Sequence, residues 1–250
     1  MSWLNGPPAA DVEVPAVVQR LAGGGAVRCV WANRLGGMTF ALGDPPARYA
    51  KWIPRGVDPV VADLGVEAER MRWAAHHTPV PTVLELGGDG DATWLVTSAL
   101  PGTSAIDDRW KAEPEPAVRA IGHGLRALHD ALPVDDCPFD WSPTHRLAHL
   151  QPQHEHLRLQ LADAPAPDRL VVCHGDPCAP NTIVDGAGRW VGHVDLGSLG
   201  VADRWADLAV AAMSLGWNFG PGWDATFHEA YGIEPDPDRI AYYRLLWDST

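Results

Sequence analysis

The chain has 250 residues, of which 46% are hydrophobic and 20% charged, and its formal net charge is -13 at pH 7. This length supports one large domain or two packed lobes. The negative charge repels phosphate backbones and anionic lipid, so neither nucleic acid nor a membrane surface is an expected partner. The four cysteines form no C-x-x-C pair and the N-terminus lacks a signal-peptide pattern. We therefore expect a cytoplasmic protein with reduced thiols.

The first part of the chain has the pattern of short strands separated by glycine-rich turns. The expected strands are 26–31, 38–42, 49–53, 82–86 and 94–98. One helix is expected from about residue 60 to 76, because Leu64, Ala68, Met71 and Ala75 recur at spacings of three and four.

After Pro101-Gly102 the pattern becomes mostly helical. The expected helices are 116–130, 144–162, 204–215, 223–231 and 238–247, and the expected strands are 170–173, 182–185 and 190–194. The last two strands flank Gly186-Ala187-Gly188, which predicts a hairpin. The sequence therefore predicts an α+β protein with a mainly antiparallel N-terminal lobe at 1–97, a hinge at 98–102 and a mainly helical lobe at 103–250.

Three polar residues lie in one window of the second lobe. Asp176 follows an apolar strand within His174-Gly175-Asp176, where its carboxylate can accept a hydrogen bond from a substrate hydroxyl. The hairpin brings Asn181 and Asp195 to one end, and both offer the oxygen ligands that magnesium prefers. Each residue alone is as readily explained by turn capping. Together and in this order they indicate phosphoryl transfer from ATP, which needs a residue to orient the hydroxyl, metal ligands and a cation on the phosphates.

The stretch from Val171 to Ala209 resembles the catalytic core of the aminoglycoside phosphotransferases, most closely those that modify the 3'-hydroxyl. Weaker similarity covers most of the chain, including residues 136–140 and 231–246. The resemblance implies a protein-kinase-like bilobal fold, ATP or GTP as the phosphate donor, and Mg²⁺.

The resemblance also assigns roles in the second lobe. Asp176 would be the catalytic aspartate, and Asn181 and Asp195 would hold the metal. We expect Arg204 and Asp207 to lock the loop after Asp195 and not to touch substrate.

In the first lobe, Lys51 stands where the family places its phosphate-binding lysine, and Glu67 would be its ion-pair partner on the helix. Glu69 is a rival for this pairing, but it lies about 200° around the helix from Glu67, so both cannot face Lys51. Judged alone, Lys51 and Glu67 would be an ordinary strand lysine and a solvated helix charge.

The nucleotide contacts implied by the resemblance are mostly backbone contacts. The Ser98 carbonyl and the Leu100 amide would bind the adenine edge at the hinge. Gly36 and Gly37, in the turn from Asn33 to Met38, would cover the phosphates, since glycine allows close backbone approach.

The chain departs from the family pattern on the acceptor side. The segment between Asp140 and Leu170 is shorter than a 3'-phosphotransferase would have, and Ser198 stands where the family usually has arginine. Residues 217–219 and 247–248 replace expected acidic pairs. We therefore expect an open or reshaped acceptor pocket.

The function expected is transfer of the ATP γ-phosphate to a hydroxyl of an aminoglycoside or similar amino sugar. A kinase for another small alcohol or sugar metabolite is an alternative, as is a catalytically silent pseudokinase that binds nucleotide. A hydrolase built on His174 and Asp176 is disfavoured, because no Ser or Cys lies in a nucleophile elbow. Four histidines of the expected helix 144–162 form no recognisable zinc ligand set. These are His145, His149, His154 and His156.

Overall fold

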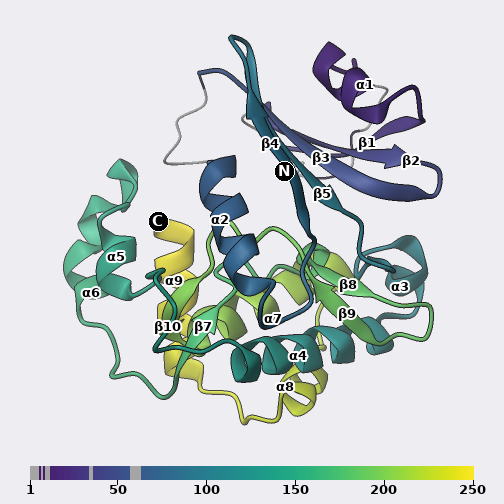
Figure 1. Cartoon of the computed structure of the whole chain (residues 1–250). Helices are drawn as coiled ribbons and strands as arrows, with labels where there is room; N and C mark the ends of the chain where they lie inside the picture. Colours follow the sequence, from purple (N-terminus) through teal and green to yellow (C-terminus); the bar gives the residue numbers. More distant parts are fainter. Residues whose placement is uncertain (1–5, 7, 9–11, 34–35, 57–62) are drawn as a thin grey trace. The chain divides into compact units, whose positions relative to one another are not determined.

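The computed structural model describes residues 6, 8, 12–33, 36–56 and 63–250, and the chain divides into two compact units. The first comprises Met1–Ala75 and Pro81–Ala99, and the second comprises His76–Val80 and Leu100–Thr250. Figure 1 labels their helices and strands. Residues 76–80 belong to the second unit, whereas the sequence placed them in the first lobe. The Pro79 carbonyl of this segment accepts a hydrogen bond from the His193 N–H of the second unit at 3.4 Å.

The first unit is built on one antiparallel sheet in the order β1-β2-β3-β5-β4. Its strands are β1 (Val27–Ala32), β2 (Met38–Gly43), β3 (Pro46–Pro54), β4 (Val83–Gly88) and β5 (Ala92–Ser98). Its helices are α1 (Ala16–Ala22) and α2 (Leu64–Ala74). The strands follow the expected ranges closely, and α1 was not expected.

Alternating residues of the sheet pack against the two helices on opposite faces. Val96 of β5 belongs to an apolar cluster with Val18 of α1, whereas the adjacent Leu95 packs with Leu64 and Ala68 of α2. Successive side chains of a strand point to opposite faces, so α1 and α2 cover different sides of the sheet. Asp63 begins α2 by accepting N–H bonds from the first turn of the helix.

The second unit is mainly helical, with two small sheets ordered β10-β7 and β6-β8-β9. Its helices are α3 (Asp108–Ala112), α4 (Pro114–Ala131), α5 (Pro143–Leu147), η1 (Pro152–Leu157), α6 (Arg158–Ala162), η2 (Ala179–Asn181), α7 (Trp205–Phe219), α8 (Asp224–Tyr231) and α9 (Pro237–Ser249). Its strands are β6 (Thr103–Ser104), β7 (Leu170–Cys173), β8 (Thr182–Val184), β9 (Trp190–His193) and β10 (Gly200–Asp203).

Helix α4 lies at the centre of the hydrophobic core of this unit. Its apolar stripe includes Ile121, Leu125 and Leu128, which are fully buried, and α4 packs against β7, β8, β9, α7 and α8 (Figure 1). Helix α7 is buried along most of its length. Within the described part of the chain, no helix is both long and apolar enough to cross a membrane.

The expected single helix over 144–162 is wrong. The structure has α5, η1 and α6 in its place, so the four histidines do not share one helix. Pro152 explains the break, because proline has no N–H to donate and disfavours helical backbone in the preceding Gln151, whose ψ is 139°.

Candidate active site

The first unit contains a lysine and a glutamate that form an ion pair. The Cα of Lys51 pairs with that of Leu95, which lies on the face covered by α2, so Lys51 points towards that helix. Its Nζ lies 2.7 Å from Oε1 of Glu67, and the glutamate side chain is only 6% exposed. Glu69 is exposed. Glu67 is therefore the partner of Lys51, and the role of this pair at the phosphates stays a prediction.

The turn between β1 and β2 contains the two predicted glycines. Gly36 has φ 82°, a conformation that side-chain-bearing residues rarely adopt, and the Gly37 N–H donates to Asn33 Oδ1 at 2.8 Å. Arg34 and Leu35 lie outside the described residues. Gly36 and Gly37 thus lie on the side of the turn that leads into β2, and their role at the phosphates stays a prediction.

The predicted adenine contacts lie where the chain passes from one unit to the other, between Ala99 and Leu100. The Ser98 N–H donates to the Thr82 carbonyl at 2.9 Å. The return bond from the Thr82 N–H goes to the Ser98 hydroxyl at 2.8 Å, where a regular ladder would use the Ser98 carbonyl. The Ser98 hydroxyl thus accepts the bond that the Ser98 carbonyl would accept in a regular ladder. This arrangement suits the prediction that the Ser98 carbonyl binds adenine.

The loop after β7 places Asp176 at the end of a buried strand. Both ring nitrogens of the buried His174 are engaged: Nδ1 accepts the Asp176 N–H at 3.3 Å, so Nε2 carries the proton and donates to the Val194 carbonyl at 3.0 Å. The imidazole therefore ties the loop to the segment that precedes Asp195. The Asp176 side chain is half-buried.

A buried carboxylate on α7 fixes the beginning of the same loop. Asp207 Oδ2 accepts the His174 N–H at 2.6 Å, and Oδ1 accepts the Gly175 N–H at 2.9 Å. Gly175 has φ 84° and packs directly against the Ser198 backbone. The prediction that Asp207 locks the loop after Asp195 is therefore wrong in its location, because Asp207 holds the loop before Asp176. Arg204 bonds Asp168.

Two residues of this network were not identified from the sequence. His129 Nε2 lies 2.9 Å from Asp207 Oδ2, and His129 Nδ1 lies 2.9 Å from the Tyr231 hydroxyl. Burial raises the pKa of Tyr231 to about 12. The available signal was that His129 continues the buried stripe of α4, four residues after Leu125.

The predicted metal ligands lie at the open end of the β8–β9 hairpin. The Val194 N–H donates to the Asn181 carbonyl at 3.0 Å, which places Asp195 beside Asn181. Asn181 Nδ2 donates to the Asp176 carbonyl at 2.9 Å, and because a carbonyl only accepts, the amide oxygen faces away from it. Asp195 has φ 64° and is the one non-glycine residue with positive φ in the described part of the chain. Such a strained carboxylate is typical of a functional position.

Comparison with known proteins shows the family of the chain. Residues 38–243 match the model of the phosphotransferase enzyme family. The chain belongs to this family. An aminoglycoside 3'-phosphotransferase of Streptomyces fradiae is 38% identical over 80% of this chain and 85% of its own. A streptomycin 3''-kinase of Streptomyces griseus is 36% identical over 92% of this chain and 95% of its own. The solved aminoglycoside phosphotransferase APH(3'')-Id of Streptomyces rimosus superposes with a TM-score of 0.70, at 29% identity, covering 96% and 98% of the two chains.

The protein-kinase-like α+β fold expected from the sequence is thereby confirmed, and the chain is an aminoglycoside phosphotransferase-like enzyme of the phosphotransferase family. The two thiols near the catalytic loop contribute no nucleophile. Burial raises the pKa of Cys173 and Cys178 well above the usual thiol value, and nearby carboxylates add to the shift. Both therefore stay protonated at neutral pH.

The segment between Asp140 and Leu170 is the one that the resemblance assigns to the acceptor, and that role stays a prediction. The segment between Asp140 and Leu170 forms three short helices that pack against α9, where the Tyr242 hydroxyl donates to the Leu161 carbonyl at 2.7 Å. The rings of Trp217 and Trp247 lie 6.2 Å apart, and Trp217 is 46% exposed. Aromatic side chains thus stand where carboxylates were expected.

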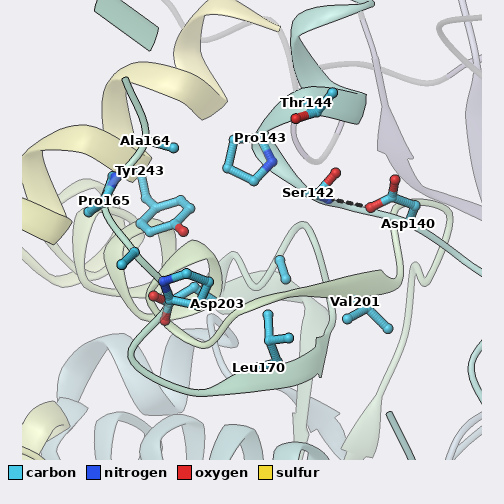
Figure 2. A pocket seen from close by; sticks show the side chains of 13 residues that line it. Asp140, Ser142, Pro143, Thr144, Ala164, Pro165, Leu170, Val201, Asp203 and Tyr243 are labelled. Atoms are coloured by element: carbon cyan, nitrogen blue, oxygen red, sulfur yellow. Dashed lines mark hydrogen bonds between the residues drawn. The ribbon is translucent and has the colours of Figure 1, made fainter. Parts of the chain in front are cut away.

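A pocket of about 390 Å³ lies between the two ends of this shortened segment (Figure 2). Asp140 and residues 142–144 and 164–167 line it, together with Leu170 of β7, residues 201–203 and Tyr243 of α9. Leu170 begins β7, whereas the catalytic loop follows Cys173 at the other end of the strand. None of the predicted catalytic, metal-binding or nucleotide-binding residues lines this pocket.

Proposed function

We propose that the chain transfers the γ-phosphoryl group of ATP to a hydroxyl of an aminoglycoside, with Mg²⁺ held by Asn181 and Asp195. The observation that carries the proposal is the convergence of three residues within the second unit. Asn181 bonds the Asp176 carbonyl and lies beside Asp195 at the open end of the hairpin. Relatives at 36% and 38% identity are named as enzymes that phosphorylate aminoglycosides, and a structure of the Streptomyces rimosus enzyme contains ADP and streptomycin.

The donor set suits magnesium, because a carboxylate and an amide oxygen are hard ligands. The ion would neutralise negative charge on the phosphates. Asp195 would supply a full negative charge to it and Asn181 a neutral oxygen. The αL backbone of Asp195 is a conformation that a non-glycine residue rarely adopts, which suits a residue held in place for a functional role.

Asp176 would act on the acceptor. Its carboxylate accepts the hydrogen bond of the attacking hydroxyl and takes its proton as the new oxygen–phosphorus bond forms. The bond from the γ-phosphorus to the β,γ-bridging oxygen breaks, and ADP leaves with that oxygen. The proton on Asp176 then passes to solvent, which restores the carboxylate. Asp207 fixes the backbone that leads into Asp176, and the His174 ring accepts the Asp176 N–H.

Lys51 would neutralise the phosphates in the first unit, with Glu67 holding its ammonium group in place. Gly36 and Gly37 would cover the phosphates, and the Ser98 carbonyl and Leu100 amide would bind adenine. GTP is an alternative donor, because the resemblance allows either nucleotide. We also propose a cytoplasmic location, because the cytoplasm supplies the ATP that the reaction uses.

The proposed acceptor rests on the names of the similar enzymes, and an assay with a set of acceptors tests it. Purified protein is assayed for ADP release with ATP or GTP, Mg²⁺ and a set of acceptors: an aminoglycoside with a free 3'-hydroxyl, its 3'-deoxy analogue, streptomycin, and simple sugars. We expect turnover with an aminoglycoside, and loss of turnover with the 3'-deoxy analogue if the 3'-hydroxyl is the acceptor.

The streptomycin arm is included because a streptomycin 3''-kinase matches over 92% of the chain. Turnover with sugars and none with any aminoglycoside would contradict the acceptor. Tight nucleotide binding without turnover of any acceptor would indicate a pseudokinase. Asp176→Asn is the matched inactive control, because it keeps the shape of the side chain and removes its basicity.

A further inference from the structure

The turn η2 (Ala179–Asn181) joins the two residues on which the proposed chemistry depends. Asp176 lies just before it, and Asn181 is its last residue. The distance between the catalytic carboxylate and the metal-binding amide therefore depends on how firmly this turn is held. Two hydroxyl groups, from two distant segments of the second unit, bond to consecutive residues of the turn.

The first hydroxyl belongs to Ser214 of α7, which is fully buried. Its Oγ accepts the Ala179 N–H at 2.9 Å. Asn218, one helical turn later, donates its side-chain N–H to the Ser214 carbonyl at 2.8 Å and to Oγ at 3.2 Å. Ser214 thus holds the first residue of the turn, and Asn218 fixes the Ser214 hydroxyl in its place.

The second hydroxyl belongs to Ser104 of β6. Its Oγ donates to the Pro180 carbonyl at 2.9 Å and accepts the Ile106 N–H at 3.4 Å. Proline has no backbone N–H, so its carbonyl is the main-chain group through which this residue can be held. The adjacent Ala105 N–H donates to the Thr182 carbonyl at 2.8 Å, just beyond Asn181. The β6 segment thus supports both sides of the metal-binding residue.

We propose that Ser214 and Ser104 are positioning residues for phosphoryl transfer, forming a serine clamp that sets the separation between the Asp176 carboxylate and the Asn181 amide oxygen. The inference rests on the proposed function of these two residues. Rotation of the peptides at Ala179 and Pro180 would redirect Asn181, and a displacement of about 1 Å at reacting groups can cost about 10²-fold in rate. Both hydroxyls act on the backbone of the turn, so loss of the clamp should affect the chemical step more than binding.

A purely structural role for these serines predicts a different result. Loss of either hydrogen bond would then lower the melting temperature and leave kcat unchanged. The clamp predicts that kcat falls while KM for ATP and for the acceptor stays nearly constant. It also predicts weaker binding of Mg²⁺ in the presence of ADP, because Asn181 is a proposed ligand.

The test uses the full chain carrying Ser214→Ala, Ser104→Ala or both, with Thr103→Val as the matched control. Thr103 is the neighbour of Ser104 on β6, but its hydroxyl accepts from Trp110 Nε1 at 3.2 Å and not from the turn. We expect each serine variant to lower kcat about tenfold, and the double variant to lose less than the product of the two losses, because both act on one turn. Ser104→Thr, which keeps the hydroxyl at a partly exposed site, should restore kcat, and Thr103→Val should retain it.

The readout that does not depend on turnover is the shift in melting temperature on titrating Mg²⁺ at saturating ADP, compared with ADP alone. The serine variants should need more Mg²⁺ for the same shift. Wild-type kcat and Mg²⁺ response in Ser104→Ala and Ser214→Ala would overturn the clamp, whatever their stability. If Ser214→Ala does not fold, Ser104→Ala and Ser104→Thr decide the matter alone. Absence of turnover in the wild type would contradict the proposed function instead, and the Mg²⁺ titration would still test the clamp.

Discussion

The buried carboxylate of Asp207 accepts the backbone N–H of His174 at 2.6 Å, so helix α7 holds the first residue of the catalytic loop. The other oxygen accepts the Gly175 N–H at 2.9 Å, and His129 Nε2 completes the set at 2.9 Å. Both oxygens of a fully buried group are therefore occupied by nitrogen partners. The loop that presents Asp176 is fixed before any ligand arrives.

Replacing Asp207 by Asn should destabilise the protein. The variant amide has one oxygen, and its NH₂ group would face an N–H donor in either orientation, which leaves buried donors unpaired. We expect the free energy of unfolding to fall by about 2–4 kcal/mol, measured by urea denaturation. Asp130→Asn is the control: its carboxylate pairs with Arg126 and Arg169 at an exposed site and should cost less than about 1 kcal/mol. Equal losses in the two variants would contradict the anchoring role of Asp207.

The Lys51–Glu67 pair should matter to catalysis through the lysine. We expect Lys51→Met to lower kcat/KM by about 10²–10³-fold, the range found when a group that stabilises transition-state charge is removed. Glu67→Gln should also lower it, because the neutral amide holds the ammonium less firmly. In the Lys51→Met background the added cost of Glu67→Gln should be small, as shown by a double-mutant cycle. The exposed Glu69→Gln serves as control, and a loss there as large as that of Glu67→Gln would refute the pairing.

Sequence reasoning succeeded where the information is local. Strand alternation and glycine turns placed the five strands of the first unit within a few residues, and the two strands flanking Gly186-Ala187-Gly188 form the expected hairpin. The hairpin alone sufficed to bring Asn181 and Asp195 together. Local spacing also showed that Glu67 and Glu69 cannot both face Lys51, because side chains two positions apart on a helix point in different directions.

What the sequence could not provide are the bonds that join distant segments. Asp207 bonds His129, 78 positions away, and Ser104 bonds Pro180, 76 positions away. A buried serine on an apolar helix has the same sequence pattern whether it holds a catalytic turn or only fills space. Pro152 was a local signal against one helix over 144–162, and the helical pattern around it obscured the break.

Tyr231 should make stability depend on pH in the alkaline range. Burial raises its pKa to about 12, against an ordinary value of about 10. The folded protein therefore holds this proton more tightly than the unfolded chain, so the contribution is complete below pH 10 and is lost as pH rises towards 12. A shift of two units corresponds to about 2–3 kcal/mol at most.

The measurement compares Tyr231→Phe with the wild type. The variant loses the hydrogen bond to His129 and should be less stable by about 1 kcal/mol at pH 7. Its stability should then fall less steeply between pH 10 and 12. Parallel pH profiles for the two proteins would show that the Tyr231 hydroxyl is not the group responsible.

Substitutions of Asp195 can distinguish the effect of its backbone conformation on stability from the effect of its charge on turnover. Its φ of 64° lies in the left-handed region, which asparagine also tolerates but alanine adopts at a cost of about 1 kcal/mol or more. Asp195→Asn should therefore fold with nearly wild-type stability, whereas Asp195→Ala should be destabilised by that amount. Both should lose most turnover, because neither supplies the negative charge proposed to hold Mg²⁺. Gly197→Ala lies outside the proposed ligand set and provides the comparison for a backbone change nearby. Retention of Mg²⁺-dependent turnover in Asp195→Asn would show that the Asp195 carboxylate is not needed to hold the metal ion.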